Sequence, residues 1–586
     1  MTKQKELIIF ALLSAIAVVV HFWGINWGTP NWQRSLQVFN NVENIKRYTP
    51  QMIKLREKLY TKGMAFSDRK ETFTKEEFNK YFTPHAQSPF ETLSTDTVLD
   101  FSRGYLLGLV LSDEQQTTSC LANIHPEKLD FDPKTDYMHG GFYHLSLGAF
   151  LYFFKALKYL TITSDFSFYT ANPILMMRIY LIARVFSVIA ALLGILMVYL
   201  IAKLLMDKKY AMFGAFMFSI NPLLLVYSHQ IKPHTFGIFL ALAGVYCCAV
   251  FLARNDGKRS YLLPAVFFGL STACVLSNGI FVLSIPLAEM ISKIYRNEKY
   301  KSGNVILSMF VTVIVFLLMQ PYVVTNFTRF YNGAIAHNII GYEYGVFGIK
   351  NAAMFLYDVL RFGHNWILIP AVILGTVNLH KARKAENTFF LSIAAIFIFF
   401  AAFFMKHQGV FTLAMPFICI ISAAGINLMI NSSGAKKTAG HIYAVLIIVT
   451  FIASTAFYEQ LFVQKGNLTN AGKWINENVP EKSTVGIPTG WALPGHFPAM
   501  EFLKYKTINF PIDVNMIEQN PGKYPQYLVL TKPFMFMSSI SSIKNSYSEI
   551  KRFNAPGALL GIPFRNDYVP TENMDVLVLK KNGKTG

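Results

Sequence analysis

The sequence predicts a polytopic α-helical membrane protein with a long polar loop after its first helix and a small α/β domain at its C-terminus. Three observations predict this class. Of the 586 residues, 53% are hydrophobic and only 15% are charged, whereas charged residues make up about a quarter of an ordinary soluble protein. Apolar runs near the length of about 20 residues that crosses a bilayer core recur along the chain. The basic residues lie mostly in short loops between these runs.

The apolar runs predict about eleven membrane spans. The first run follows a short basic N-terminus, as a signal peptide would, but no small-residue cleavage site follows it, because the next residues are His21, Phe22 and Trp23. We therefore expect an uncleaved helix. The predicted spans are 6–23, 178–205, 210–228, 235–253, 260–276, 279–292, 304–324, 365–379, 388–405, 410–430 and 441–459.

The basic residues behind the formal net charge of +20 indicate how the spans are oriented in the membrane rather than a nucleic-acid-binding surface. A nucleic-acid binder concentrates Lys and Arg on one soluble face, whereas short basic loops of a membrane protein stay on the cytoplasmic side. An N-terminus on the cytoplasmic side places all the basic short loops on that side, and an odd number of spans then puts the C-terminus outside. We expect the protein to lie in the cytoplasmic (inner) membrane. The loops are 207–209, 254–259, 293–301, 381–384 and 436–437.

The same alternation places three polar segments outside, at about 24–177, 325–364 and 460–586. In the last of these, a helical pattern at 470–479 precedes short β-branched runs, the first at 484–487. Helix patterns that alternate with brief strands are typical of a small α/β domain. The chain is therefore divided into a membrane domain, 1–459, and a C-terminal domain, 460–586.

The first outside loop is the natural place to search for chemistry, because carboxylates are frequent in it. Asp113 and Glu114 precede an amphipathic stretch, which is followed by Asp130, Asp132 and Pro133. We expect Asp130 and Asp132 to shape the turn that leads into an apolar helix at about 144–160, which we expect to lie on the membrane surface.

These segments, in this order, resemble the polyprenyl-phosphate-dependent glycosyltransferases of the GT-C superfold, which include protein O-mannosyltransferases and lipid A aminoarabinose transferases. No single motif is specific, and order and topology carry the resemblance over nearly the whole membrane part. The matching positions are Asp113-Glu114, Asp132-Pro133, 137–143, Arg178, Arg184, Asn221-Pro222, 227–229, 320–322 and 406–409.

Two departures from the family stand out. Many members place the acidic pair soon after the first helix, where this chain reads 28–34 without a carboxylate. The pair stands about eighty residues further along, which indicates an insertion between about 31 and 105 and leaves open a base elsewhere in the loop. Position 234 is His where members often have Asp, so a second acidic site of the family is unmatched.

The resemblance implies inverting transfer of a hexosyl or pentosyl group from a polyprenyl-phosphate donor to a protein, lipid or glycan. Such transfer needs a base for the acceptor hydroxyl and cations for the leaving phosphate. We expect Asp113 as the base and Glu114 as its positioning neighbour. Lys232 and Lys406 also fit the simpler role of interfacial anchors, and His364 that of a helix cap. The expected substrate-binding residues are Lys406, His407, Arg329, Lys232, Tyr137 and His364.

Other classes of protein find less support in the sequence. It has no P-loop, no nucleophile elbow and no HExxH helix. The five cysteines form no disulfide or metal-binding pattern. No cofactor, metal or nucleic-acid partner is expected, although the sequence leaves open a requirement for a divalent cation. The alternatives are a transporter or lipid flippase, which would show internal repeats and mid-membrane charges, and a non-catalytic scaffold.

Overall fold

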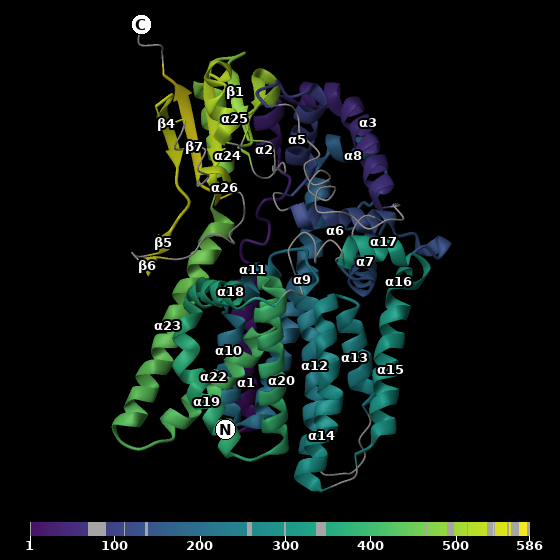
Figure 1. Ribbon diagram of the computed structural model, residues 1–586, viewed down its shortest axis with the longest axis vertical. Coiled ribbons are helices and arrows are strands. Elements are labelled where there is room, and N and C mark those ends of the chain that lie inside the picture. Colours follow the sequence, from purple (N-terminus) through teal and green to yellow (C-terminus); the bar gives the residue numbers. More distant parts are fainter. Residues whose placement is uncertain are drawn as a thin grey trace.

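The computed structural model places a sheet-containing domain on one end of an upright helix bundle (Figure 1). We call this end of the bundle the domain side. The N-terminal helix begins at the opposite end of the bundle. The residues that the structure describes are 2–67, 89–109, 112–134, 137, 139–254, 261–297, 300–335, 347–464, 466–488, 497–511, 514–535, 543, 545–559, 562–563 and 573–582.

Within the described residues, seven helical segments are long and apolar enough to cross a membrane. One further pair, α10 (Lys208–Ser219) and α11 (Pro222–Ser228), is bent by 55° and makes an eighth if the two form one span. The prediction of a multi-pass membrane protein is confirmed. The seven segments contain α1 (Lys3–Phe22), α9 (Pro173–Leu205), α12 (His234–Ala253), α15 (Ser302–Met319), α18 (Ile349–Arg361) with α19 (Ile369–Lys381), α20 (Ala385–Phe400) and α23 (Ala435–Val463).

The other three predicted spans form shorter or interrupted helices. The run 260–276 contains α13 (Leu262–Thr272), and the run 410–430 contains α22 (Met415–Ile430). The run 279–292 is divided between a 3₁₀ segment and α14 (Ser284–Arg296). Each predicted run is therefore largely helical, while the count of eleven crossings stays a prediction.

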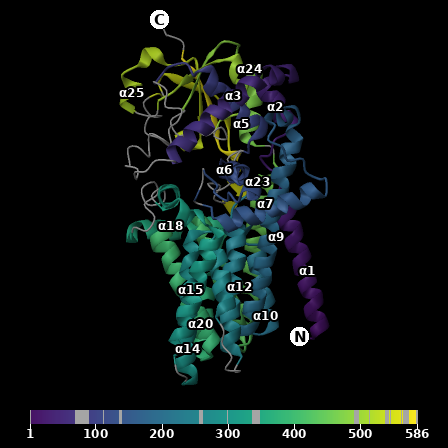
Figure 2. The same ribbon diagram turned by 90° about the vertical axis from the view of Figure 1, so that its right-hand side faces the viewer.

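The helix predicted to lie on the membrane surface is α7 (Gly141–Ala156), which runs across the domain-side ends of the spans (Figures 1 and 2). Two glycines allow its start to press against the ends of α13 and α15. A Cβ on Gly140 would lie 1.8 Å from the Ala273 carbonyl oxygen, and one on Gly141 would lie 2.3 Å from that of Met319. Any larger residue at either position would lift α7 off the bundle.

The predicted C-terminal α/β domain is confirmed. Its five-stranded sheet has the order β2-β1-β3-β7-β4, in which β1 pairs in parallel with β2 and β3, and β7 pairs antiparallel with β3 and β4. The charged edge strand β4 had no clear signal in the sequence, because nearly every side chain on it faces solvent. The bounds are α24 (Asn467–Asn478), β1 (Thr484–Ile487), β2 (Lys506–Asn509), β3 (Tyr527–Thr531), β4 (Tyr547–Phe553) and β7 (Val576–Lys581).

The long first loop packs on this domain. The Phe90 amide donates to the Asn509 carbonyl at 2.8 Å and the Leu93 amide to the Thr507 carbonyl at 2.8 Å, so the loop pairs with β2 at the sheet edge. An unpaired edge would otherwise expose backbone groups. One hydrophobic core joins residues of the loop helices to residues of the sheet. The predicted boundary at 459/460 stays a prediction. The loop helices are α2 (Trp32–Phe39), α3 (Val42–Ser67), α5 (Thr95–Leu107), α6 (Ser112–Asn123) and α8 (Phe166–Ala171).

Candidate active site

A fully buried ion pair holds α6 against the bundle at the domain side. Glu114 of α6 accepts two hydrogen bonds from the guanidinium of Arg184 on α9, each 2.8 Å long. Both side chains have no exposed surface. Arg184 also donates to the carbonyl oxygens of Ile25 and Trp27, at 2.7 and 2.6 Å, and lies 4.5 Å from the centre of the Trp27 ring. Protein groups therefore occupy the donors and acceptors of the pair, which makes it a structural anchor.

This anchor also positions the neighbouring predicted base. The Ile231 amide donates to Glu114 at 2.8 Å, which holds the first turn of α6 against the segment that contains Lys232. Asp113 directly precedes Glu114 in α6, although its side chain lies outside the described part of the chain. The backbone of the predicted base is therefore brought to the segment that carries a predicted phosphate ligand.

A second group of polar side chains gathers at the start of α12. Lys232 and His234 are both buried, and the His234 ring lies 5.8 Å from the ring of His407, which comes from a distant part of the sequence. A Cβ on Gly409 would lie 2.4 Å from His234 Nε2, so the glycine allows the His407 segment to approach this closely. We call Lys232, His234, His407 and Gln408 the cationic cluster.

Gln408 was not singled out from the sequence, because a neutral amide gives no charge signal. Its side chain is only 3% exposed, and among the described residues neither its amide nitrogen nor its amide oxygen has a hydrogen-bond partner. The same holds for Nδ1 of His234. Buried polar atoms are nearly always paired with protein, water or a ligand. The cationic cluster therefore has the capacity to bind a polar ligand.

Two other predicted substrate residues face a different element. Lys406 has a left-handed backbone conformation, with φ of 49°, and its Nζ lies 4.0 Å from the position of a Cβ on Gly348, just before α18. His364 follows α18 and accepts a hydrogen bond from Trp366 Nε1 at 3.2 Å. Both residues are thus placed near the ends of α18, the helix that lies across the bundle in Figure 1.

The remaining predicted residues, Tyr137 and Arg329, meet at Asp132. The Tyr137 hydroxyl donates to Asp132 Oδ1 at 2.6 Å, and Asn326 donates to Oδ2 at 2.7 Å. Arg329 also contacts Oδ2, at 3.4 Å. Burial, the Asp132 charge and the hydrogen bond all raise the pKa of Tyr137 well above its usual value, so the phenol stays a donor. Asp132 thus links the first loop to α16 (Tyr322–Thr325) and α17 (Phe327–Phe330).

Asp132→Asn is expected to destabilise the fold by about 1–3 kcal/mol, because an amide replaces a buried carboxylate that accepts bonds from Asn326 and Arg329. Asp130→Asn is the matched control, because that carboxylate is 33% exposed and pairs with Lys134, four residues along the chain. Thermal unfolding of the detergent-solubilised protein measures both. Equal melting temperatures for the two variants would contradict the proposed link.

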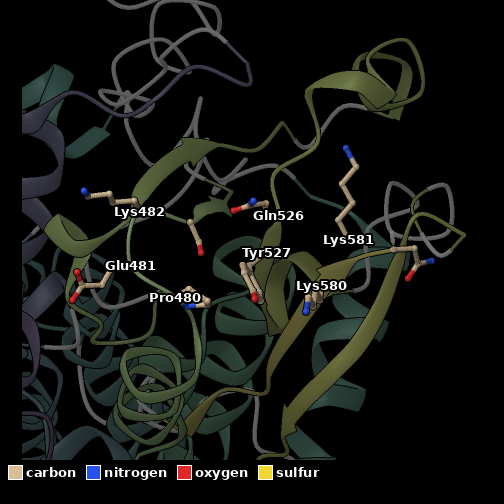
Figure 3. Close-up of a pocket in the computed structure, with 9 residues that line it drawn as sticks. Pro480, Glu481, Lys482, Gln526, Tyr527, Lys580 and Lys581 are labelled. Atoms are coloured by element: carbon tan, nitrogen blue, oxygen red, sulfur yellow. The ribbon is translucent and has the colours of Figure 1, made fainter. Parts of the chain in front are cut away.

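A cavity lies elsewhere, on the sheet domain (Figure 3). It has a volume of about 560 Å³, and its lining includes Glu481, Lys482 and Tyr527 as well as Lys580 and Lys581 at the end of β7. These residues belong to the sheet domain rather than to the spans, so this cavity is separate from the cationic cluster. No three His, Cys, Asp or Glu side chains in the described ranges are grouped as a metal site.

Comparison with known proteins supports the predicted resemblance. The family described as dolichyl-phosphate-mannose-protein mannosyltransferase matches residues 174–323. This range covers α9 to the start of α16 and includes Lys232 and His234. The match confirms the resemblance to this branch of the GT-C glycosyltransferases over that part of the chain. No curated protein matches the chain by sequence.

Three solved structures match the chain at low sequence identity and with TM-scores below 0.5. The oligosaccharyltransferase of Archaeoglobus fulgidus with a tethered acceptor peptide is 14% identical, with a TM-score of 0.40, and covers 72% of this chain. This chain spans only 65% of that protein. The same organism's AglB, with an inhibitory peptide and a dolichol-phosphate, is 14% identical with a TM-score of 0.42, over 77% of this chain and 71% of its own. ArnT of Cupriavidus metallidurans, bound to undecaprenyl phosphate, is 10% identical with a TM-score of 0.45, over 97% of both chains.

The helix bundle and its sheet domain define the class of protein: a multi-pass membrane protein with a small α/β domain at one end of the bundle. Within that class, the chain is similar to the dolichyl-phosphate-mannose-protein mannosyltransferases over residues 174–323.

Proposed function

We propose that this chain is an inverting glycosyltransferase that moves a hexosyl or pentosyl group from a polyprenyl-phosphate carrier to an acceptor. The observation that carries the proposal is the cationic cluster, whose buried Gln408 amide and His234 nitrogen have no partner among the described residues. The cluster lies at the domain-side ends of the spans, the level at which a membrane carrier presents its phosphate. Two proteins with similar folds bind polyprenyl phosphates.

The reaction forms one bond, breaks another and moves one proton. The acceptor oxygen attacks the anomeric carbon, the bond from that carbon to the carrier phosphate oxygen breaks, and the acceptor proton passes to a carboxylate. We assign the proton to Asp113 and the leaving phosphate to Lys232, His407 and Lys406, through charge-assisted hydrogen bonds. Arg329 supplies less free charge than the sequence implied, because Asp132 neutralises it.

The proposed orientation puts the domain side outside the cytoplasmic membrane and the N-terminus inside. Basic loops such as 207–209 and 436–437 lie at the opposite end of the bundle from the sheet domain, as the charge rule expects for the cytoplasmic face (Figure 1). Glu6 near the N-terminus pairs there with Lys203 and Lys208.

Lys232→Gln is expected to weaken donor binding about 10- to 100-fold, because a charge-assisted bond to phosphate contributes about 1.5–3 kcal/mol. The experiment supplies the purified protein in proteoliposomes with polyprenyl-phosphate hexoses and pentoses, and measures donor binding and release of the free carrier phosphate. Lys473→Gln on α24 is the control, because the Lys473 side chain is 66% exposed.

The same experiment separates the alternatives. Release of carrier phosphate together with a glycosylated acceptor supports transfer. Movement of an intact sugar-lipid across the bilayer indicates a flippase, and donor binding without turnover indicates a scaffold. Unchanged binding in the Lys232→Gln variant would remove Lys232 from the site.

A further inference from the structure

The C-terminal end of α7 and the turn after it expose large apolar side chains. Tyr152 is 65% exposed, Phe153 57%, Leu157 60% and Tyr159 47%. The opposite side of α7 is buried, with Leu147 and Leu151 packed in the core. In water, such a cluster of exposed aromatic rings is unusual, so this face is suited to another environment.

Three cations lie among these rings. Lys155 Nζ lies 4.7 Å from the centre of the Tyr152 ring, and the Arg178 guanidinium lies 5.7 Å from that of Tyr159. Lys158 is exposed on the turn between them. We call Tyr152, Phe153, Leu157 and Tyr159, together with Lys155, Lys158 and Arg178, the α7 patch.

No carboxylate neutralises the α7 patch within the part of the chain that the structure describes. None of its three cations forms an ion pair there. The nearest carboxylate along the chain, Asp165, instead accepts hydrogen bonds from Ser167 at the start of α8. The patch therefore presents three positive charges with no internal compensation.

The turn that carries Lys158 is held by the backbone. Lys158 has a left-handed conformation, with φ of 59°, which costs a non-glycine residue roughly 1 kcal/mol or more. The amides of Lys158 and Tyr159 donate to the carbonyls of Lys155 and Phe154, at 2.9 and 3.0 Å. The lysine is thus fixed on this tight turn, where a glycine would be less strained.

The α7 patch lies at the level of the lipid headgroups. The start of α7 rests on the ends of α13 and α15, and Arg178 lies in the second turn of α9, a helix of 33 residues. A helix of that length extends to about 50 Å and exceeds a hydrocarbon core of about 30 Å. Figures 1 and 2 both show α7 across the domain-side ends of the spans. Aromatic rings and Lys or Arg side chains concentrate at this depth in membrane proteins.

We propose that the α7 patch is a binding site for anionic phospholipid headgroups in the leaflet on the domain side. The rings lie among the upper acyl chains and the three cations contact the phosphate and the additional negative charge of the headgroup. A zwitterionic headgroup offers the same phosphate but no net charge, so the site prefers anionic lipid. This inference does not depend on glycosyl transfer, because none of its residues belongs to the cationic cluster or to α6.

The test uses the full-length protein in nanodiscs of phosphatidylcholine with a minor fraction of phosphatidylglycerol. Native mass spectrometry or lipid extraction measures the ratio of the two lipids that remain bound. The wild type is expected to enrich phosphatidylglycerol, and each single change of Lys155, Lys158 or Arg178 to Gln is expected to lower that enrichment up to about fivefold, at roughly 1 kcal/mol per cation. The triple variant should retain the two lipids in their bulk proportion.

The controls separate charge from fold. Lys155→Arg with Lys158→Arg keeps the charges and should keep the enrichment. Lys473→Gln with Lys551→Gln removes two exposed charges from the sheet domain and should change nothing. Enrichment that persists in the triple Gln variant overturns the proposal. Enrichment lost equally in the Arg variant also overturns it, because packing rather than charge would then be responsible.

Discussion

Asp113→Asn is expected to lower the rate of sugar transfer by about 100- to 10,000-fold, the range that a general base contributes. The variant removes the proton acceptor but keeps the size of the side chain. Donor binding should stay within about twofold, because the phosphate is assigned to cations on other elements. The measurement is single-turnover release of polyprenyl phosphate, with donor affinity determined on the same preparation.

The control for this change is Asp96→Asn in α5, a carboxylate of the same loop whose side chain is 61% exposed and pairs with the exposed Lys58. It should keep wild-type turnover. Full turnover in the Asp113→Asn variant would assign the base to another carboxylate of the loop. Loss of donor binding together with turnover would mean that Asp113 acts on ligand binding rather than on the proton.

The second large effect is expected from Glu114→Gln, which should destabilise the fold by about 3–5 kcal/mol because it leaves the buried Arg184 charge without a counterion. The amide oxygen can still accept a bond from the Ile231 amide, but the amide nitrogen cannot accept the second bond from Arg184, so the change removes a hydrogen bond together with the charge. Chemical or thermal unfolding in detergent measures it. The exposed Glu127, whose side chain is 65% exposed, supplies the control as Glu127→Gln.

A double-mutant cycle sharpens this second prediction. Arg184→Met alone should also be costly, because Glu114 would then be the uncompensated charge. The double variant Glu114→Met, Arg184→Met should recover part of the loss, since both charges are gone, but not all of it. The carbonyl oxygens of Ile25 and Trp27 would still lose the donor that Arg184 provides. Strictly additive effects would contradict a direct pair.

Much of the membrane architecture could be predicted from the sequence, because the bilayer imposes a length and a composition on each span. The runs 178–205 and 235–253 correspond to α9 and α12 within a few residues. The breaks were harder to predict. The bend of 55° between α10 and α11 falls at Asn221 and Pro222, where a proline removes a backbone donor inside an apolar run. Hydrophobicity alone carries no information about such a bend.

The site was predicted only in part. Charge and family resemblance singled out Lys232 and His407, but the approach of His407 to His234 depends on Gly409, which carries no chemical signal of its own. Gln408 is neutral and was passed over for the same reason. Tyr137 and Arg329 were chosen separately, and Asp132, which was expected only to shape a turn, connects them.

The sequence determined that this chain crosses a membrane several times and carries a small α/β domain. The length of an apolar run and the pattern of a strand are local properties, so each can be recognised within a single segment. Only the tertiary structure decided which polar side chains are paired with other protein groups and which can still bind a ligand. Glu114 carries a carboxylate that could take part in catalysis, but Arg184 on another helix binds both of its oxygens. The side chain of Gln408, by contrast, has no hydrogen-bond partner among the described residues. Pairing of this kind depends on contacts between residues far apart in the chain, so no local pattern reveals it.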